Sequence, residues 1–573
     1  MSEITTNLFR SGVRRTSGQK SRRLNLLAAM LIGDLVRNLL GPRGLEKMFV
    51  DILGEVTVTK DGATLLRKID VDHPAARLVI EGSNAVDNEV GDGTTSVVVL
   101  TGALLRHATD LLDMGVAPRI VIDGYLRGLQ LYLECLDDFA ESFPNNDRNV
   151  IGGLIDTSLK PKIITSILNQ DEVTRLVTDA IFAVANFEQN NVEIDDIKIE
   201  EGLGDMNGTT LVDGVVIDKT IDNPSMPRIA QNAKILLLDE DLESKRTKTE
   251  AEVIATSPQQ LQEYFRKEQF TISLKVKTIV DSGANVVFSR KGISAQAQSQ
   301  LSKAGIISIR RVKENDIRWL EKATSAQVVR DIDVNTFLSR YMGYAKRVQE
   351  KYIGQDKMVI VEGCINPRSV TLLLRASSKR LLEEYHRSVL DAIAVARNFV
   401  YRPLVVGGGG SSDIMIANWI RKRANSIGGR QQIVLQKFAD AIEEIPLTIA
   451  RNAGMNIIDT LTAMRAKLQS NDPSFGKSHE NKWIGIDAIQ RKVTEVFDNR
   501  IIEPALVKEQ IIKTAVEVST LLLGVEDVIM AKPTEFTHTH SDGTEHAHAR
   551  GNEKHDHYFD KLGKQQRPTH HYY

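Results

Sequence analysis

Hydrophobic and polar positions follow a helical period along the first quarter of the chain. Apolar residues recur every three or four positions over residues 24–40, 94–114 and 117–139, and this spacing predicts three long amphipathic helices. Pro42 lies between two glycines and ends the first of them, because proline cannot continue a helix and glycine permits the exit. A short strand pair is expected over residues 48–58.

The middle of the chain changes to short apolar runs that are typical of strands. Residues 233–238, 285–289 and 305–310 are apolar and β-branched enough for a buried sheet. Between the first two runs lies a polar helical stretch, residues 258–280. A polar helix inserted between two core strands is expected to project from the body of its domain. Further strands are expected at residues 194–199, 209–218, 357–362 and 369–375, followed by a helix over residues 379–398.

Residues 411–523 return to the helical pattern of the first 140 residues. At 573 residues the chain is too long for one hydrophobic core, and roughly three or four domains are expected. The order helical, mixed, α/β, mixed, helical predicts nested domains. In such an arrangement the two outer parts form one domain, and the middle domains are insertions into it.

The two ends of the chain differ from the rest in composition. Residues 1–20 form a basic leader, and residues 533–573 carry eight of the twelve histidines with few aliphatic residues, so both are expected to be disordered. The paired tail histidines allow either loose binding of divalent transition metals or a purely solvated tail. The start superficially resembles a signal peptide, but Asp34 and Arg37 interrupt its apolar stretch and indicate an amphipathic helix. No run of about 18 apolar residues exists, so no membrane is expected as a partner.

Overall composition narrows the classes of function. The chain is 42% hydrophobic and 26% charged, which is typical of a globular protein. Its formal net charge of −2 provides no overall positive field that would attract nucleic acid. Cys135 and Cys364 are the two cysteines, far apart and without zinc-ligand spacing to the body histidines. They fit a reducing compartment, and we expect a cytoplasmic protein.

The run Gly91-Asp92-Gly93-Thr94-Thr95 is the strongest candidate for chemistry. Its two glycines let the backbone come close to a ligand, and its threonines and the following helix N-terminus offer hydrogen-bond donors to an anion. The carboxylate between them would repel a bare phosphate, so the run favours a phosphate together with a cation. Magnesium is the natural candidate for that cation. The alternative is a glycine turn that caps a buried helix.

Two further aspartates and one glycine run are weaker candidates. Asp61-Gly62 forms a turn at a loop–helix junction, 31 positions before Asp92. Asp391 lies in the middle of an apolar helix, where it either caps a neighbouring loop or faces a polar site. The four glycines at residues 407–410 are either a second phosphate or ribose contact or a hinge.

Several short motifs occur together in a characteristic order. They are Leu40-Gly41-Pro42-Arg43-Gly44, Thr59-Lys60-Asp61-Gly62-Ala63-Thr64, Gly91-Asp92-Gly93-Thr94-Thr95, Val361-Glu362-Gly363-Cys364, the glycines at 407–410, Phe438-Ala439-Asp440-Ala441, Asn452-Ala453-Gly454 and Ile502-Glu503-Pro504. With these motifs in this order and spacing, the chain resembles a group II chaperonin subunit, of the archaeal thermosome or the eukaryotic cytosolic chaperonin. The resemblance covers about residues 20–532.

The resemblance implies a multidomain α and α/β chaperonin fold and an ATP-dependent chaperone. The family has a helical equatorial ATP-binding domain, a mixed intermediate domain and an α/β apical domain whose helical protrusion serves as a built-in lid. Its implied boundaries are 21–145 and 405–532 (equatorial), 146–215 and 366–404 (intermediate), and 216–365 (apical), with the lid near 258–280. Identical or paralogous subunits would form a double ring that binds and encloses non-native polypeptides, closing its lid on ATP hydrolysis.

The resemblance also implies ATP and Mg²⁺ as cofactors, and roles for individual residues. Asp92 matches the magnesium-binding aspartate, and Asp61 and Asp391 match the carboxylates that position and activate the attacking water. The nucleotide-contacting positions are Leu40, Gly41, Pro42, Gly62, Gly91, Gly93, Thr94, Thr95, Ser96, Lys160, Lys162, Gly408, Asp487 and Glu503. Among these, Lys160 or Lys162 falls in the loop that senses the γ-phosphate. Gly408 and Asp487 match positions near ribose and adenine.

The chain also departs from the family pattern. Residues 376–378 are Ala-Ser-Ser where a glycine pair is usual, and residues 411–413 are Ser-Ser-Asp where an alanine and a glutamate are usual. The three aspartates remain intact and favour an active ATPase. Two alternatives stay open: a structural subunit of a hetero-oligomeric ring with weak ATPase, and a free-standing kinase or small-molecule ATPase. The last is weakened because no second-substrate pocket is recognisable.

Overall fold

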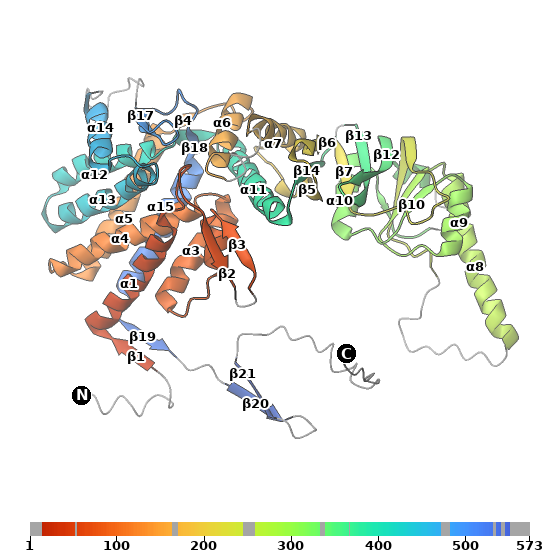
Figure 1. Cartoon of the computed structure of the whole chain (residues 1–573), viewed down its shortest axis with the longest axis horizontal. Coiled ribbons are helices and arrows are strands. Elements are labelled where there is room, and N and C mark those ends of the chain that lie inside the picture. Colours follow the sequence, from red (N-terminus) through yellow and green to blue (C-terminus); the bar gives the residue numbers. More distant parts are fainter. Residues whose placement is uncertain are drawn as a thin grey trace, which may run out of the picture.

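The computed structural model describes residues 14–51, 54–162, 170–243, 258–332, 338–365, 367–470, 482–530, 535–539 and 545–549. These residues form three bodies in a row, each around its own large hydrophobic core (Figure 1). We call them the helical body (residues 18–139 and 404–524), the middle body (148–212 and 370–401) and the far body (214–364). A smaller apolar cluster, which includes Val212, Ile353 and Leu373, joins the middle and far bodies.

The helical body is built from both ends of the chain. Its helices are α1 (Gly18–Arg37), α2 (Gly62–Lys68), α3 (Pro74–Val90), α4 (Thr94–Asp113), α5 (Pro118–Phe139), α12 (Ser411–Ile427), α13 (Gly429–Asn452), α14 (Ile457–Ser470) and α15 (Ala505–Gly524). Helix α4 packs against α1, α3, α13 and α15, because it carries apolar residues on several sides. The long helices predicted from periodicity are confirmed as α1, α4 and α5. Among the described residues, no helix is long and apolar enough to cross a membrane.

Helices α1 and α4 cross at two glycines. A Cβ atom added at Gly33 would lie 3.2 Å from the Cα atom of Gly102 and 3.2 Å from the carbonyl oxygen of Val98. Larger residues at either glycine would force the helices apart. This close approach explains how α1 packs directly against α4 in the core of the helical body.

Short strands lie around the edges of the helical body. They are β2 (Lys47–Val50) and β3 (Val56–Thr59), the three-stranded set β4 (Glu141–Ser142), β15 (Leu404–Gly407) and β18 (Ile502–Pro504), and the pair β16 (Ile484–Asp487) and β17 (Lys492–Glu495). The pairing of β2 with β3 confirms the strand pair predicted over residues 48–58. Strand β15 leads directly into the glycine run at 407–410 and thereby fixes its position.

The middle body is mixed in structure. It contains α6 (Arg148–Leu159), α7 (Gln170–Val184), α11 (Lys379–Tyr401), β5 (Ile197–Leu203), β6 (Thr210–Val212) and β14 (Val370–Ala376), with short 3₁₀ turns at Ile194–Asp196 and Met206–Gly208. Strand β14 is central, parallel to β5 and antiparallel to β6. Helix α11 starts after Ser378, whose hydroxyl oxygen accepts a hydrogen bond from the Leu381 amide at 3.3 Å. Its length brings it against α3 and α15 of the helical body.

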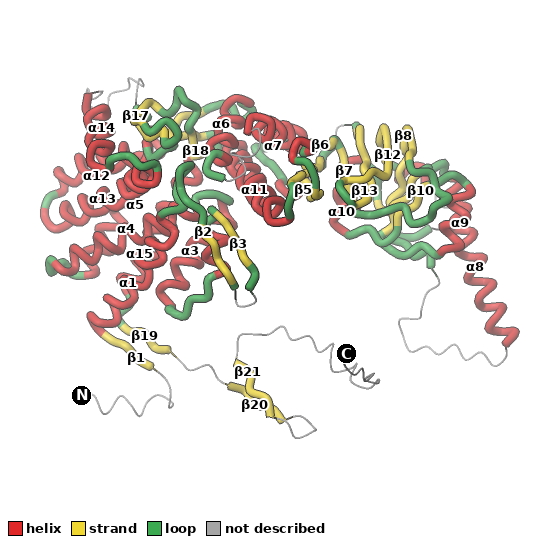
Figure 2. Tube along the Cα trace, viewed as in Figure 1, coloured by secondary structure: helices red, strands yellow, loops and turns green. Residues whose placement is uncertain are grey.

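The far body has a mixed sheet with helices packed on it (Figure 2). Its strand order is β10-β9-β8-β12-β13-β7, and β11 also pairs with β8. The elements are β7 (Gly214–Ile217), β8 (Ile229–Leu238), β9 (Val286–Ser289), β10 (Ile307–Ile309), β11 (Val328–Val329), β12 (Gly343–Ile353), β13 (Asp356–Cys364), α8 (Pro258–Asp281), α9 (Ala295–Lys303) and α10 (Glu314–Thr324), with a 3₁₀ turn at Leu338–Tyr341. The buried strands predicted from apolar runs are confirmed as β8, β9 and β10. Strand β12 was not predicted, because charged residues interrupt its sequence.

Helix α8 confirms the helix predicted over residues 258–280 and extends from the end of the far body (Figure 1). Phe270 near its middle is 70% exposed. The expectation that the whole stretch projects is wrong for its second half. That half packs into the far-body core through three aliphatic side chains at helical spacing: Ile272, Val276 and Ile279.

The expectation of a disordered leader over residues 1–20 is wrong for its last part. Strand β1 (Arg14–Ser17) pairs antiparallel with β19 (Asp527–Met530), and α1 already begins at Gly18. An ion pair between Arg15 Nη2 and Asp527 Oδ2, at 2.6 Å, supports the pairing. Local composition could not reveal this strand, because its partner lies 512 residues later. Residues 1–13 lie outside the described residues.

The expectation of disorder over residues 533–573 is wrong for two short segments. Strands β20 (Glu535–Thr539) and β21 (Glu545–Ala549) pair as an antiparallel hairpin. Strand pairing satisfies backbone N–H and C=O groups and does not depend on aliphatic side chains. The scarcity of aliphatic residues was therefore no guide to it. The other tail residues lie outside the described residues.

Candidate active site

A cavity of about 420 Å³ lies where α6 and α11 of the middle body meet the loops of the helical body. Most of the residues singled out from the sequence line this cavity: Leu40, Gly41, Pro42, Asp61, Gly91, Asp92, Gly93, Thr94, Thr95, Ser96, Lys160, Lys162, Asp391, Asp487 and Glu503. Segments that are more than 400 positions apart in the chain thus line the same cavity. Gly62 and Gly408 do not line the cavity.

The turn before α4 has the conformation that its glycines predict. Gly91 ends α3 with φ of 67°, and Gly93 precedes α4 with φ of 84°, both in the left-handed region that favours glycine. A Cβ atom at Gly93 would lie 2.5 Å from the Ile511 side chain. Asp92 Oδ1 accepts a hydrogen bond from the Gly93 amide at 2.6 Å. The N-terminus of a 20-residue helix therefore faces the cavity beside a carboxylate, an arrangement suited to an anion with a cation.

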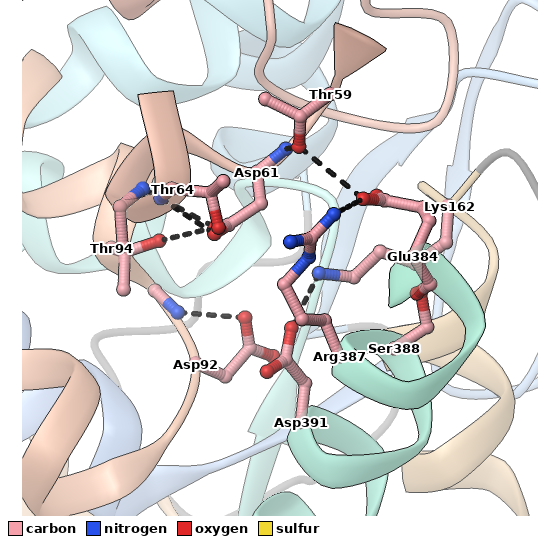
Figure 3. A network of polar contacts seen from close by, with 12 residues as sticks. Thr59, Asp61, Thr64, Asp92, Thr94, Lys162, Glu384, Arg387, Ser388 and Asp391 are labelled. Atoms are coloured by element: carbon pink, nitrogen blue, oxygen red, sulfur yellow. Dashed lines mark hydrogen bonds and ion pairs between the residues drawn. The ribbon is translucent and has the colours of Figure 1, made fainter. Parts of the chain in front are cut away.

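Asp61 caps the N-terminus of α2 from the opposite loop. Its Oδ2 accepts from the Thr64 amide at 2.8 Å, and its Oδ1 accepts from the Thr94 hydroxyl at 3.3 Å (Figure 3). A Cβ atom at Gly62 would lie 2.6 Å from Thr95 Oγ1, so the two loops touch behind the cavity wall. Gly62 is thus a packing position. Lys162 and the hydrogen bonds from Thr64 outweigh the effect of burial and keep the pKa of Asp61 below its usual value.

Asp391 reaches the same place from α11. Lys162 Nζ donates to Asp391 Oδ2 at 2.5 Å, and Figure 3 shows Asp391 and Asp92 on the same side of the cluster. Burial raises the pKa of Asp391 to about 7, although Lys162 opposes the shift. Burial likewise raises the pKa of Asp92. Of the two readings that the sequence allowed for Asp391, a cap for a neighbouring loop or a residue that faces a polar site, the structure supports the second.

Lys162 is the central cation of this cluster. Burial lowers its pKa, but Asp391, Asp61 and Asp92 together outweigh burial and keep its pKa above the usual value. Lys160 instead pairs with Asp156 of its own helix at 2.7 Å. Between the two candidate lysines, Lys162 is the one in contact with the aspartates.

The loop after α1 is fixed by two residues that were not predicted as site residues. Asn452 Nδ2 donates to the Leu40 carbonyl oxygen at 2.8 Å, and Lys60 Nζ donates to the Pro42 carbonyl oxygen at 3.1 Å. Gly41 between them has φ of 84°. Lys60 and Asn452 both lie in short motifs that carry the family resemblance, and this was the only sequence signal for them.

The far side of the cavity is lined by Gly409 rather than by Gly408. Gly409 has φ of 58°, and a Cβ atom there would lie 2.5 Å from the Ile486 carbonyl oxygen. The Gly408 amide instead donates to the Ile501 carbonyl oxygen at 2.9 Å. Four identical residues in a row give no signal for register, so the sequence did not show which of these glycines lines the cavity. The contact of Gly408 with the nucleotide stays a prediction.

Asp487 and Glu503, which line the cavity on the Gly409 side, already make contacts within the protein. Asp487 Oδ1 accepts from the amides of its own turn, at 2.9 and 3.0 Å. Lys508 Nζ lies 3.1 Å from Glu503 Oε2 and 2.9 Å from Asp413 Oδ2. Burial raises the pKa of Glu503 despite that lysine. Asp413 stands where a glutamate is usual, and its bond with the buried Lys508 is a structural role that the sequence did not indicate.

The carboxylates do not form a complete metal site by themselves. Within the part of the chain that the structure describes, no group of three His, Cys, Asp or Glu side chains is arranged to bind a metal. Magnesium in phosphate sites usually takes one or two carboxylates, with phosphate oxygens and water as the other ligands. Asp92, half-buried beside a helix N-terminus, fits that incomplete donor set.

Comparison with known proteins identifies the family. The family model described as the TCP-1/cpn60 chaperonin family matches residues 32–533. The thermosome subunit beta of Archaeoglobus fulgidus is 40% identical over 534 residues, covering 92% of this chain and 95% of that protein. The thermosome subunit alpha of Sulfolobus acidocaldarius is 39% identical over 554 residues, covering 95% and 97%. The chain belongs to the TCP-1/cpn60 chaperonin family.

Within that family the relatives define a narrower class. The chain is a group II chaperonin subunit, with a mixed, multidomain chaperonin fold. It is an ATPase whose activity is coupled to chaperone function, and it assembles with other chaperonin subunits.

Proposed function

We propose that the cavity binds ATP with Mg²⁺, and that Asp391 activates the water that attacks the γ-phosphate. One observation carries the proposal: Asp391 from the middle body lies on the same cavity as the Asp61 and Asp92 loops of the helical body. Phosphoryl transfer needs charge neutralisation and a positioned water more than it needs covalent chemistry. Lys162 offers a positive charge, and Asp61 and Asp391 offer carboxylates that can position a water molecule.

The helical body supplies the phosphate contacts in this proposal. The amides at the start of α4 and the Thr95 hydroxyl would donate to phosphate oxygens, and the Leu40-Gly41-Pro42 loop would approach from the other side. Asp92 would ligate magnesium, which neutralises charge on the phosphates when it is bound. Asp487 and the glycine run at 407–410, of which Gly409 lines the cavity, would contact ribose and adenine, and Glu503 lines the same cavity.

Asp391 and Asp61 have different environments and therefore suit different roles. A carboxylate with a pKa of about 7 can accept a proton from water near neutral pH, which is the property required of a general base. Asp61, whose pKa is lowered, stays ionised and accepts hydrogen bonds. It orients the water and the Thr94 hydroxyl. Lys162 bridges to Asp391 and would contact the γ-phosphate.

Asp391 lies on a helix of the middle body, whereas Asp61 and Asp92 lie in the helical body, so hydrolysis depends on how these two bodies are placed. Helix α11 belongs to the middle body, so the site is complete only while that body lies against the helical body. A movement that withdraws α11 also withdraws the base. ATP hydrolysis would in this way be tied to closure of the chamber.

At the level of the assembly, we propose that the helical, middle and far bodies are the equatorial, intermediate and apical domains. Identical or paralogous subunits form a double ring that encloses non-native polypeptides, and the projecting half of α8 forms part of the lid. A cytoplasmic location is supported by Cys135 and Cys364, which are both buried and unpaired.

The comparison of two alanine variants tests the division of roles. Asp391→Ala should leave ATP affinity nearly unchanged and lower turnover by about two to four orders of magnitude, the usual contribution of a general base. Asp92→Ala should weaken magnesium-dependent ATP binding as well as turnover. Equilibrium nucleotide binding and single-turnover hydrolysis, measured on the assembled ring, distinguish the two effects.

Two outcomes would contradict the proposal. If Asp391→Ala binds ATP as weakly as Asp92→Ala, Asp391 is a binding residue and not the base. If Asp391→Ala hydrolyses ATP at the normal rate, α11 does not reach the nucleotide during turnover.

A further inference from the structure

Helix α11 contacts the loop that carries Asp61 and the loop that carries Asp92 through one row of polar side chains. Glu384, Asp391 and Asn398 are spaced seven residues apart, which places them on the same face at intervals of about 10.5 Å along the helix. Asp391, in the middle of the row, is the proposed base. The two outer residues are both buried, at 3% and 2% exposure. A buried polar side chain needs a partner, and each of them finds its partner in the helical body.

Glu384 contacts the residue that fixes the backbone before Asp61. The Thr59 hydroxyl donates to Glu384 Oε2 at 3.4 Å, and the same hydroxyl oxygen accepts from the Asp61 amide at 3.0 Å (Figure 3). Thr59 is fully buried. Arg387 Nη2 donates to the same Glu384 oxygen at 2.7 Å and orients the carboxylate. One hydroxyl group therefore links α11 to the main chain of Asp61.

Asn398 makes the equivalent contact at the other loop. Its Nδ2 donates to the Val90 carbonyl oxygen at 2.7 Å, at the last residue of α3. The next two residues in the chain are Gly91 and Asp92. A Cβ atom at Gly91 would lie 2.4 Å from the Cβ atom of Ala394, so the helix and this turn are in direct contact. Asn398 therefore fixes the point from which the Asp92 turn leaves α3.

We propose that Glu384, acting through Thr59, and Asn398 are positioning residues through which α11 sets the placement of the Asp61 and Asp92 loops relative to Asp391. The inference rests on the proposed roles of those aspartates and extends them. In this arrangement α11 delivers the base and aligns both of its partner loops in one docking event. A partly docked helix would leave all three carboxylates misplaced together.

The expected effect is on the rate and not on nucleotide affinity. Neither Glu384 nor Asn398 lines the cavity, so neither contributes a direct contact to ATP. Displacing a catalytic group by about 1 Å costs up to about 100-fold in rate. We therefore expect a 10- to 100-fold loss in kcat, with the dissociation constant for ATP within about twofold of that of the unmodified protein.

The chain offers closely matched variants for this test. Thr59→Val removes the linking hydroxyl at nearly constant shape, and Thr59→Ser retains it. Thr101→Val is the control, because Thr101 is buried in the same body but its hydroxyl donates only to its own helix, to the Val97 carbonyl oxygen. Glu384→Leu removes the acceptor and leaves Arg387, whose side chain is partly exposed, able to reach water. Asn398→Ala tests the second loop.

Single-turnover hydrolysis, equilibrium ATP binding and the thermal midpoint are measured on the assembled protein for each variant. Thr59→Val, Glu384→Leu and Asn398→Ala should each lower kcat 10- to 100-fold, whereas Thr59→Ser and Thr101→Val should retain the normal rate. The double variant Thr59→Val/Glu384→Leu should lose no more than the more damaged single variant, because both remove the same link.

The outcomes separate this inference from the proposed function. If Asp61→Asn and Asp92→Asn lower turnover but Thr59→Val and Asn398→Ala do not, the aspartate roles stand and the positioning role is wrong. If Asp61→Asn hydrolyses ATP normally, the proposed function fails first. A loss of rate in Thr59→Val that is matched by Thr101→Val would show a general loss of core packing and would also overturn the inference.

Discussion

At the residue scale, environment assigns different properties to three chemically identical aspartates. Asp61 accepts several hydrogen bonds and has a lowered pKa, whereas burial raises the pKa of Asp92 and Asp391. Lys162 lies among all three and is the reason that their charges can coexist in a buried cavity. The identity of these residues was evident from the sequence, but their protonation depends on neighbours from distant segments.

The raised pKa of Asp391 leads to a prediction about pH. A general base must be deprotonated, so a carboxyl group with a pKa of about 7 is active above pH 7 and is lost as the pH falls through that value. The single-turnover rate of the ring should therefore fall roughly tenfold per unit below about pH 7. The residual rate of Asp391→Asn should lack this dependence. A flat profile between pH 6 and 8 in the unmodified protein would contradict the assignment.

At the element scale, α8 divides into a projecting half and a core half, which sharpens a test of the lid. Deleting residues 258–270 should leave ATP hydrolysis and thermal stability nearly unchanged, because the buried side chains Ile272, Val276 and Ile279 remain. Enclosure of a non-native polypeptide should be lost. Protease protection of the enclosed polypeptide is the measurement, and protection equal to that of the full-length ring would contradict the lid role.

The matched control removes the core half as well. Deletion of residues 258–280 takes away two buried isoleucines, and loss of each costs about 2–5 kcal/mol. This longer deletion should lower the thermal midpoint, whereas the shorter one should not.

The two ends of the chain provide a second prediction at this scale. Truncation after Lys532 should leave the thermal midpoint and ATPase activity unchanged, because β19 and its pairing with β1 are retained. Truncation after Glu526 removes β19 and the ion pair of Arg15 with Asp527, so it should destabilise the start of α1 or weaken assembly. Equal behaviour of the two truncations in thermal unfolding and sedimentation would show that the β1–β19 pair is dispensable.

At the scale of the whole molecule, α1 presents an apolar row to solvent. Leu24, Leu27 and Leu31 are 44%, 50% and 58% exposed and lie at helical spacing, so one subunit alone leaves this face uncovered. The chain should sediment as a particle many times the 63.7 kDa of one subunit. The double variant Leu27→Lys/Leu31→Lys should shift it toward smaller species, whereas Ile229→Lys in the far body should not. Sedimentation of the unmodified chain as a monomer with ATP and magnesium would indicate that it needs partner subunits.

Much of the fold could be predicted locally. The long helices of the helical body, strands β8, β9 and β10 of the far-body sheet and the helical nature of α8 all followed from hydrophobic periodicity. Strand β12 and the pair of β1 with β19 did not. Their stabilising partners are distant in the chain, and their own composition is polar or mixed.

By itself, the sequence determined the glycine turns and the set of candidate aspartates, since backbone preference and residue chemistry are local properties. Only the tertiary structure decided that Lys162 and not Lys160 meets Asp391, that Gly409 and not Gly408 lines the cavity, and that Glu384 reaches Thr59. These are contacts between surfaces of separately folded segments. The two contacts of α11 depend on how it packs against segments more than 200 positions away, and packing of that kind has no signature in any single stretch of chain.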